Sequence, residues 1–372
     1  MSLRSVAFAL GFAASFIPGG VAAQLRNDRA EAVLGPELQV LSFGGLPYLK
    51  RLRQLAVPAG WAVAFRRFRL DLSSGFVSTE LSRGDSSRHT VAHLTDSQLR
   101  GAYTIGHDAL VLTVLLNLPT GLRNASAEDY AVIGAVSPSL FGFPVASYAN
   151  GFSVTGGIAA AVPAGNWSLG IAGSVRASSR FTPYADANGP ITYKPGVEAR
   201  VRAGADGLLG SSRATLGVTY STFGDDQFGS GGTLRGLYQP GTRWLAEAAL
   251  ATPIGSSLLN LSLWGFHRSP GDSASRRGEA RNPESLGAAE VSLTVPLTGP
   301  LSLEPGVSGR LSKPQTGKGE LLGLGGGLRI RLGDATSLVP TARYDTGWIE
   351  DGQGLRSNLN GSHFSALFRV AF

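Results

Sequence analysis

The feature that most constrains this chain is a long-range alternation of apolar residues with small or polar ones. Successive side chains of a β-strand point to opposite faces, so a period of two indicates strands with two unlike faces. The final segment shows the pattern clearly, because one face carries only apolar residues, namely Phe364, Ala366, Phe368, Val370 and Phe372. Its other face carries His363, Ser365 and Arg369.

Fourteen segments follow this alternation, and most have about the 9–11 residues that a tilted strand needs to cross a bilayer. They are residues 61–72, 97–105, 109–118, 151–162, 166–178, 193–206, 213–223, 241–252, 257–268, 285–296, 300–312, 319–332, 337–349 and 361–372.

The connections between these segments alternate in length. Short connections such as 163–165 and 297–299 are rich in turn-forming residues, whereas long ones such as 73–96 and 119–150 are not compact turns. Outer-membrane barrels combine short periplasmic turns with long external loops on an even number of strands. We therefore expect an all-β fold, a transmembrane antiparallel up-and-down β-barrel of about 14 strands spanning residues 61–372.

Composition supports this fold class and excludes several others. Glycine accounts for 51 of the 372 residues, charged residues make up 16%, and cysteine is absent. The lack of cysteine rules out disulfides, cysteine-ligated metals and a cysteine nucleophile. After the amino terminus no apolar run reaches the roughly 18 residues of a membrane-spanning helix.

The amino terminus has the features of a secretory signal peptide. Arg4 precedes an apolar stretch from Val6 to Ile17, and small residues Val21-Ala22-Ala23 come before Gln24. We therefore predict a signal peptide at 1–23 and export of the mature chain. Residues 24–60 do not alternate cleanly, so we expect a pre-barrel segment that either plugs the lumen or lies in the periplasm.

The predicted inner face is rich in arginine. A charge facing lipid at the bilayer midplane costs about 2–4 kcal/mol, so charged strand residues should face the lumen. Arg329, Arg331, Arg343 and Arg369 should form one cluster, with Asp345 as the one acid close in sequence and a local excess of positive charge. The arginines either make the lumen favour anions or form an Arg–Glu lattice that stiffens the wall. The predicted lumen-lining residues are Arg176, Arg200, Arg202, Arg310, Arg329, Arg331, Arg343, Asp345 and Arg369.

The sequence contains few motifs that would indicate catalysis or the binding of a cofactor or metal. Gly323-Leu324-Gly325-Gly326-Gly327 lies inside a strand with no helix after it, so it lacks the context of a phosphate-binding loop. His89 and His93 are spaced like metal ligands, but we interpret them as solvated residues of a loop. We expect no enzyme activity, no metal and no cofactor. The basic residues are dispersed along strands, which argues against a nucleic-acid partner.

The last strand resembles the C-terminal strand of outer-membrane barrels. Phe364, Phe368, Val370 and Phe372 match that pattern. The resemblance implies that the barrel assembly machinery recognises this terminus and that the chain resides in the outer membrane of a Gram-negative bacterium.

The mature chain also resembles outer-membrane transporters of the long-chain fatty-acid and aromatic-hydrocarbon type, including the phenol-degradation meta-pathway barrels. The strand plan and Leu116-Asn117-Leu118-Pro119-Thr120-Gly121 carry the resemblance, whereas the Asn-Pro-Ala signature of the fatty-acid transporters is absent. It implies passive uptake of a small hydrophobic or amphipathic molecule. An external groove on the loop after Gly121 would then contain Phe141, Phe143, Pro144 and Tyr148.

Three functional hypotheses remain open at this point. The first is a monomeric channel, embedded in outer-membrane lipid, for passive uptake of small hydrophobic or amphipathic solutes. The second is a general diffusion porin that prefers anions, a class that tends to fold a long loop inward. The third is a structural or adhesive barrel whose loops bind a partner.

Overall fold

The computed structural model describes residues 29–46, 48–106, 109–186, 189–230, 234, 236–273, 283–313 and 318–372. The predicted signal peptide at residues 1–23 lies outside these described residues.

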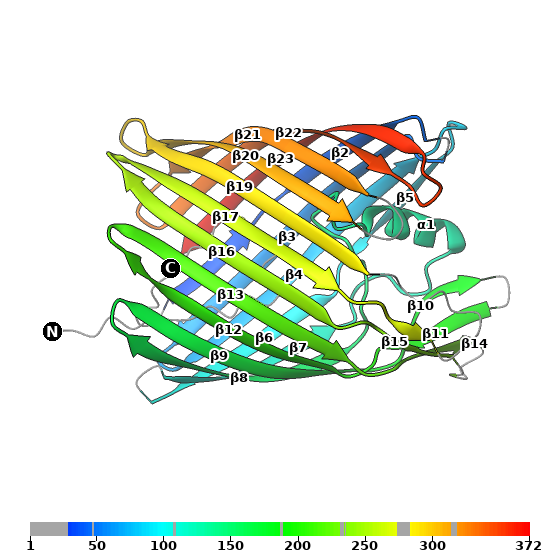
Figure 1. The fold of residues 1–372 in the computed structure, drawn as a ribbon, viewed down its shortest axis with the longest axis horizontal. Helices are drawn as coiled ribbons and strands as arrows, with labels where there is room; N and C mark the ends of the chain where they lie inside the picture. Colours follow the sequence, from blue (N-terminus) through cyan, green and yellow to red (C-terminus); the bar gives the residue numbers. More distant parts are fainter. Residues whose placement is uncertain are drawn as a thin grey trace.

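The described chain forms a closed antiparallel barrel of 16 strands (Figure 1). Two of these strands are interrupted and carry two labels each. β1 (Arg29–Leu34) and β2 (Glu37–Gly44) make the first strand, and β5 (Arg88–Leu94) and β6 (Ser97–Ile105) make the fourth. The remaining wall strands are β3 (Arg51–Phe65), β4 (Phe68–Ser82), β7 (Leu110–Leu118), β8 (Ser153–Ala164), β9 (Trp167–Ser178), β12 (Glu198–Leu209), β13 (Ser212–Phe223), β16 (Arg243–Ile254), β17 (Ser257–Arg268), β19 (Glu284–Pro296), β20 (Leu301–Lys313), β21 (Gly319–Arg331), β22 (Thr336–Glu350) and β23 (Arg356–Ala371).

The prediction that residues 24–60 precede the barrel is wrong for the part that the structure describes. β1 and β2 pair with β23 on one side and with β3 on the other, and they close the wall. The alternation is hidden here because both faces are apolar. Leu41, Phe43 and Leu52 point inward into the core, while Leu38 and Val40 point outward.

The prediction of a single strand at 61–72 is also wrong. β3 and β4 form a hairpin that turns at Arg66-Arg67, and their pairs run from Phe65–Phe68 to Arg51–Ser82. Arg66 adopts a φ of 51°, a left-handed conformation that glycine or asparagine usually supplies in tight hairpin turns. Without such a residue the turn resembles a strand interior, so the missed turn lowers the expected count by one strand, and the unpredicted strand β1–β2 lowers it by one more.

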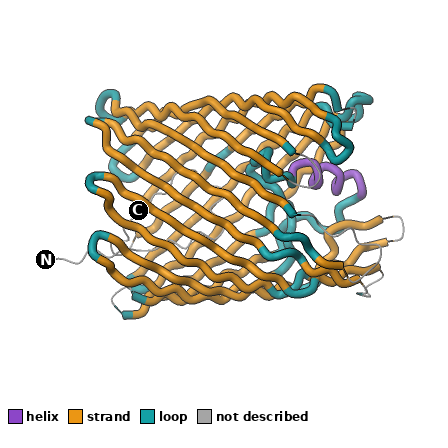
Figure 2. Tube along the Cα trace, in the orientation of Figure 1, coloured by secondary structure: helices purple, strands orange, loops and turns teal. Residues whose placement is uncertain are grey.

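The two ends of the barrel differ. Short turns occupy one end, together with β1 and the end of β23, and Gly165, Gly210 and Gly255 adopt positive φ there. Long connections occupy the other end, where helix α1 (Ala127–Val136) lies (Figure 2). A small five-stranded sheet extends beyond this rim, formed by β10 (Phe181–Asp186), β11 (Gly189–Lys194), β14 (Asp226–Ser230), β15 (Gly236–Gln239) and β18 (Asp272–Ser273). No helix among the described residues is long and apolar enough to cross a membrane.

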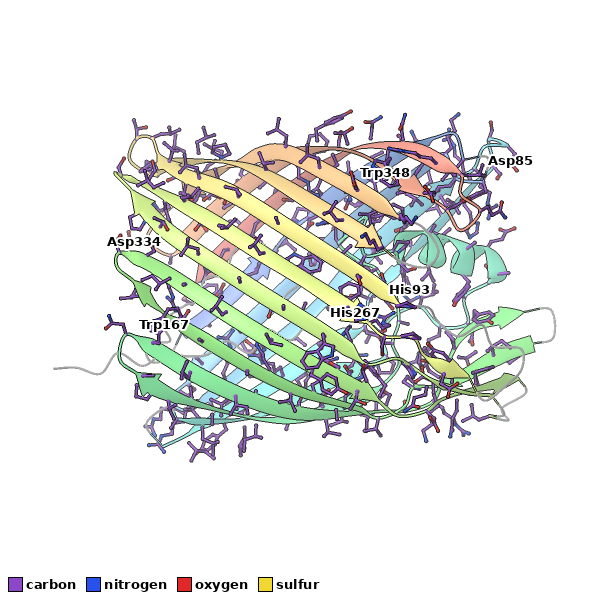
Figure 3. All side chains as sticks on the ribbon, viewed as in Figure 1. Asp85, His93, Trp167, His267, Asp334 and Trp348 are labelled. Atoms are coloured by element: carbon purple, nitrogen blue, oxygen red, sulfur yellow. The ribbon has the colours of Figure 1, made fainter. Side chains whose placement is uncertain are left out.

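Large apolar side chains cover the outward face of the wall. Leu324 is 66% exposed and Phe372 is 73% exposed, as expected for side chains that face lipid rather than a protein core. Phe364 and Phe368 also point outward, on the face predicted for them. Figure 3 shows Trp167 and Asp334 near the short-turn end and Asp85 near the loop end.

We predict that a charge introduced on the outward face of β17 destabilises the barrel more than one introduced on its inward face. Leu263→Arg places a guanidinium on the outward face and should lower the free energy of unfolding by about 2–4 kcal/mol. Ser262→Arg is the matched control, because Ser262 faces the lumen and pairs with Glu290. Chemical denaturation in lipid vesicles measures both variants, and equal losses would show that the assigned register is wrong by one residue.

Candidate functional site

Residues 119–150, the inserted loop, connect β7 to β8 and fold into the barrel. Phe141 is 5% exposed and Tyr148 is 1% exposed, and both belong to one core with Leu41, Phe43 and Leu52 of the wall. Phe143 and Pro144 are buried as well. The prediction of an external groove on this loop is therefore wrong, because its apolar side chains are removed from water by packing on the inner wall.

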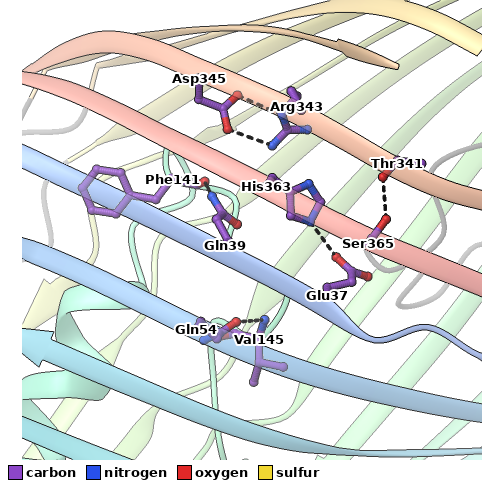
Figure 4. Close-up of polar contacts among 10 residues, drawn as sticks. All are labelled: Glu37, Gln39, Gln54, Phe141, Val145, Thr341, Arg343, Asp345, His363 and Ser365. Atoms are coloured by element: carbon purple, nitrogen blue, oxygen red, sulfur yellow. Dashed lines mark hydrogen bonds and ion pairs between the residues drawn. The ribbon is translucent and has the colours of Figure 1, made fainter. Parts of the chain in front are cut away.

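Two glutamines of the wall hold the backbone of the inserted loop. Gln39 Nε2 donates to Phe141 O at 2.8 Å. Gln54 binds both backbone polar groups of Val145. Its Nε2 donates to the carbonyl oxygen at 2.9 Å, and its Oε1 accepts from the N–H at 2.8 Å. Figure 4 shows both glutamines pointing from β2 and β3 toward the loop. These bonds satisfy polar groups of the loop that are buried away from water.

Tyr148 fixes the loop to the same region of the wall. Its hydroxyl donates to Thr79 Oγ1, which also accepts a hydrogen bond from Gln54 Nε2 at 2.9 Å. Burial raises the pKa of Tyr148 to about 12, since the phenolate would be desolvated there. The phenol is therefore a neutral donor at physiological pH.

Asp96 ties together the two ends of the inserted loop. It sits at the interruption between β5 and β6, where the register with β4 shifts by one residue. Its carboxylate accepts hydrogen bonds from Gly121 N at 2.9 Å, Asn150 N at 2.6 Å and Asn117 Nδ2 at 2.9 Å. A bulge of this kind re-aims a side chain, and here it aims a carboxylate at the base of the loop.

Helix α1 is attached to the wall through His89. Ser126 and Asp129 form a capping box at the helix start, and His89 Nε2 lies 2.7 Å from Asp129 Oδ1. Partial burial acts to raise the pKa of Asp129, but its bonds with His89 and Ser126 outweigh this and lower it. Because Phe76–Leu94 and Ser82–Arg88 are paired, His89 and His93 lie on a strand rather than on the expected loop. Within the described parts of the chain, no group of three or more His, Cys, Asp or Glu residues could hold a metal ion.

The strand register places the predicted arginines on the inward face. Arg310 reaches the inserted loop, where Nη1 lies 3.5 Å from Leu140 O, so it supports the loop from β20. Asp345 also points inward, next to Arg343 (Figure 4). The full set on this face is Arg176, Arg200, Arg202, Arg310, Arg329, Arg331, Arg343, Asp345 and Arg369.

Four arginines gather on the inner wall near the loop end, and we name Arg176, Arg200, Arg243 and Arg268 the mouth arginines. Glu198 lies within 3.7 Å of Arg176 and 3.8 Å of Arg243, and it also pairs with Arg200. Arg268 lies 3.5 Å from Glu284. Arg243 and Arg268 are not in the predicted lumen-lining set given above, and Arg268 ends its strand, where the alternation has no further residue to support it.

The arginines toward the short-turn end are more fully paired than expected. Arg329 lies 2.7 Å from Glu304, Arg343 lies 2.8 Å from Asp345, and Arg369 lies 2.6 Å from Glu31. The prediction of one acid for this group is wrong, because Glu304 of β20 pairs with Arg329 and because Glu31 belongs to a strand that the sequence pattern did not indicate. Arg331 Nη2 donates to Gly299 O at 3.3 Å.

An apolar strip runs beside the mouth arginines on the inner wall. Leu245, Trp264 and Phe266 face inward on β16 and β17, and the side chain of Trp264 is 37% exposed. Trp264 pairs in register with Glu247, which lies 2.6 Å from Arg202. The inner wall therefore places apolar surface next to guanidinium groups.

A closed barrel with an apolar outward face and a polar inner wall is a transmembrane β-barrel of the outer-membrane class. Barrels of this architecture are those that cross the outer membranes of Gram-negative bacteria, with the apolar outward face in lipid. No protein-family model and no curated protein sequence matches the chain.

Solved structures of outer-membrane channels are similar in outline. OccAB3 of Acinetobacter baumannii shares 10% identity, with a TM-score of 0.43, over 94% of this chain and 100% of that one. The CymD monoaromatic hydrocarbon channel shares 8% identity, with a TM-score of 0.42, over 94% and 90% of the respective chains. An outer-membrane channel from Pseudomonas putida F1 shares 10% identity, with a TM-score of 0.42, over 94% and 97%.

We predict that Gln54→Ala loosens the inserted loop. The substitution leaves the N–H and C=O of Val145 without their partner on the wall. Leaving buried polar groups unpaired costs about 1–3 kcal/mol of stability of the folded loop. Single-channel recording should then show a larger and noisier conductance. Gln98→Ala is the matched control, since Gln98 faces the lumen from β6 next to Ser73. Identical traces for both variants and the wild type would contradict a restraining role for Gln54.

We also predict an alkaline transition of the loop. The pKa of Tyr148 is about 12 in the fold, against about 10 in an unfolded chain. The neutral phenol therefore stabilises the folded loop fully below pH 10, and this contribution is lost as the pH rises from 10 to 12. Conductance should increase over this range in the wild type. Tyr148→Phe cannot ionise and should show no such step, and a step that persists in the variant would assign it to another group.

Proposed function

We propose that this protein is a passive channel for small amphipathic solutes that carry an anionic group. The observation that supports this best is the set of mouth arginines beside the apolar strip. An aromatic carboxylate has one charged and one apolar part, and the inner wall offers a surface for each.

The electrostatic part of the proposal rests on the unequal numbers of charges at the mouth. The four mouth arginines face two carboxylates, Glu198 and Glu284. Guanidinium remains ionised at any physiological pH, and it binds carboxylates in a bidentate manner. A carboxylate entering from the loop end therefore meets a net positive wall.

The proposed preference for small solutes rests on the inserted loop. It shares one core with the β2–β5 side of the wall and with Leu286 of β19 and Leu321 of β21, and it reaches Arg310 on β20. A lumen that is partly filled in this way favours small solutes over bulk flow. The anion-preferring diffusion porin remains the second candidate, because porins also narrow their lumen with an inward-folded loop.

We predict that Arg243→Gln combined with Arg268→Gln reduces anion preference. The double variant removes two positive charges, so the reversal potential in a salt gradient should shift toward that of a non-selective pore. The shift should shrink at high salt, since the Debye length falls from about 10 Å at 0.1 M to about 3 Å at 1 M. Arg202→Gln combined with Glu247→Gln is the control, because it removes one charge of each sign from an existing pair.

Liposome swelling with benzoate, benzyl alcohol and benzylammonium separates the candidate functions. Faster entry of benzoate than of the other two, lost in the Arg243/Arg268 variant, supports the proposed channel. Preference for small inorganic anions without any preference for benzoate favours the diffusion porin. Absence of swelling and of conductance with a correctly folded barrel would overturn both.

A further inference from the structure

Three arginines lie together on the outward face of the wall, close to the loop end. Arg51 and Arg53 project from β3, and Arg88 projects from β5. Arg51 pairs in register with Ser82 of β4, and Ser82 pairs with Arg88, so the two guanidinium groups flank one strand. We name Arg51, Arg53 and Arg88 the outer arginine patch.

The register fixes the level of this patch relative to the apolar belt. Two residues beyond Arg53 toward the short-turn end, Leu55 is an exposed apolar residue that shares its row with Leu38 and Phe364. Phe76 and Leu94 continue the belt on the neighbouring strands. The outer arginine patch therefore lies directly above the apolar belt, at the side of the barrel where the long loops emerge.

The patch is not neutralised by the wall itself. Glu80, on the same outward face, is the acid next to it, and its carboxylate lies 3.2 Å from Arg51 Nη2. Arg53 and Arg88 are exposed. Strands lie about 4.8 Å apart, so Arg51 and Arg88 are separated by about 10 Å at their backbones, a span that long side chains easily close around one phosphate.

We propose that the outer arginine patch binds the phosphate groups of a phosphorylated glycolipid in the outer leaflet. At this level the wall meets lipid headgroups rather than acyl chains, where an outward arginine is tolerated. Arginine binds phosphate in a bidentate manner. The apolar side chains just below, Leu55, Phe76 and Leu94, meet the acyl chains of the same lipid. This surface is separate from the lumen and does not depend on the solute.

The test uses the full-length protein in nanodiscs that contain diphosphorylated lipid A or its dephosphorylated form. Wild-type protein transferred to detergent should retain the diphosphorylated lipid, as quantified by mass spectrometry. Arg51→Gln, Arg53→Gln and Arg88→Gln together should lower retention at least about tenfold, since each arginine near an anionic lipid contributes to binding. Lys194→Gln, Lys313→Gln and Lys318→Gln form the matched control, because they remove three exposed cations from the same end of the barrel.

Each outcome decides for or against the proposal. Loss of lipid in the arginine variant alone supports it, provided that both variants show the heat-modifiable band of a folded barrel. Equal retention by the arginine variant and the wild type overturns it. Retention that does not depend on the lipid's phosphates, or that millimolar inorganic phosphate abolishes, also overturns it, because the patch then binds acyl chains or free anions instead. If the triple variant does not fold, Arg53→Gln and Arg88→Gln measured singly should each show a partial loss.

Discussion

The hydrogen-bonded closure of the wall is the constraint on which the rest of the molecule depends. A bilayer provides no partner for a backbone amide, so a sheet can cross it only without an edge. Here β1 and β2 complete the ladder between β3 and β23. Once the backbone is satisfied within the wall, the outward side chains adapt to lipid and the inward ones are free to carry charge.

The inner face is divided between two tasks. On the side formed by β2 to β5, apolar residues such as Leu41, Leu52 and Val77 receive the inserted loop. The side formed by β9 to β17 carries charged residues and the apolar strip, of which Phe266 packs against the same core. The loop is held through backbone groups by Gln39 and Gln54, so its position depends on the rigid wall rather than on its own side chains alone.

Sequence patterns predicted the wall well wherever its two faces differ in polarity. From β7 to β23, most residues that face the lumen are small or charged and most that face lipid are apolar, so the alternation is visible in spite of inward exceptions such as Trp264 and Phe266. The alternation did not predict β1 to β4, because inward residues such as Leu41 and Val77 are apolar there and are covered by the inserted loop. The direction of that loop could not be predicted, since Phe141 and Tyr148 would be equally suited to an outer groove. The pairing of Arg369 with Glu31 also required the unrecognised first strand.

The pairing of the first strand with the last has a consequence for how the barrel forms. Glu31 and Arg369 are hydrogen-bonded although 338 positions separate them in the chain. Closing so long a loop costs conformational entropy before any stabilising contact between the two strands has formed. The rest of the ladder is local, because each hairpin pairs with the next one along the chain. Closure is therefore expected to be the late and slow step of folding, since non-local strand pairing limits folding rates. Until β23 is in place, the nascent sheet keeps two unpaired edges, and any chain that ends before β23 keeps them permanently.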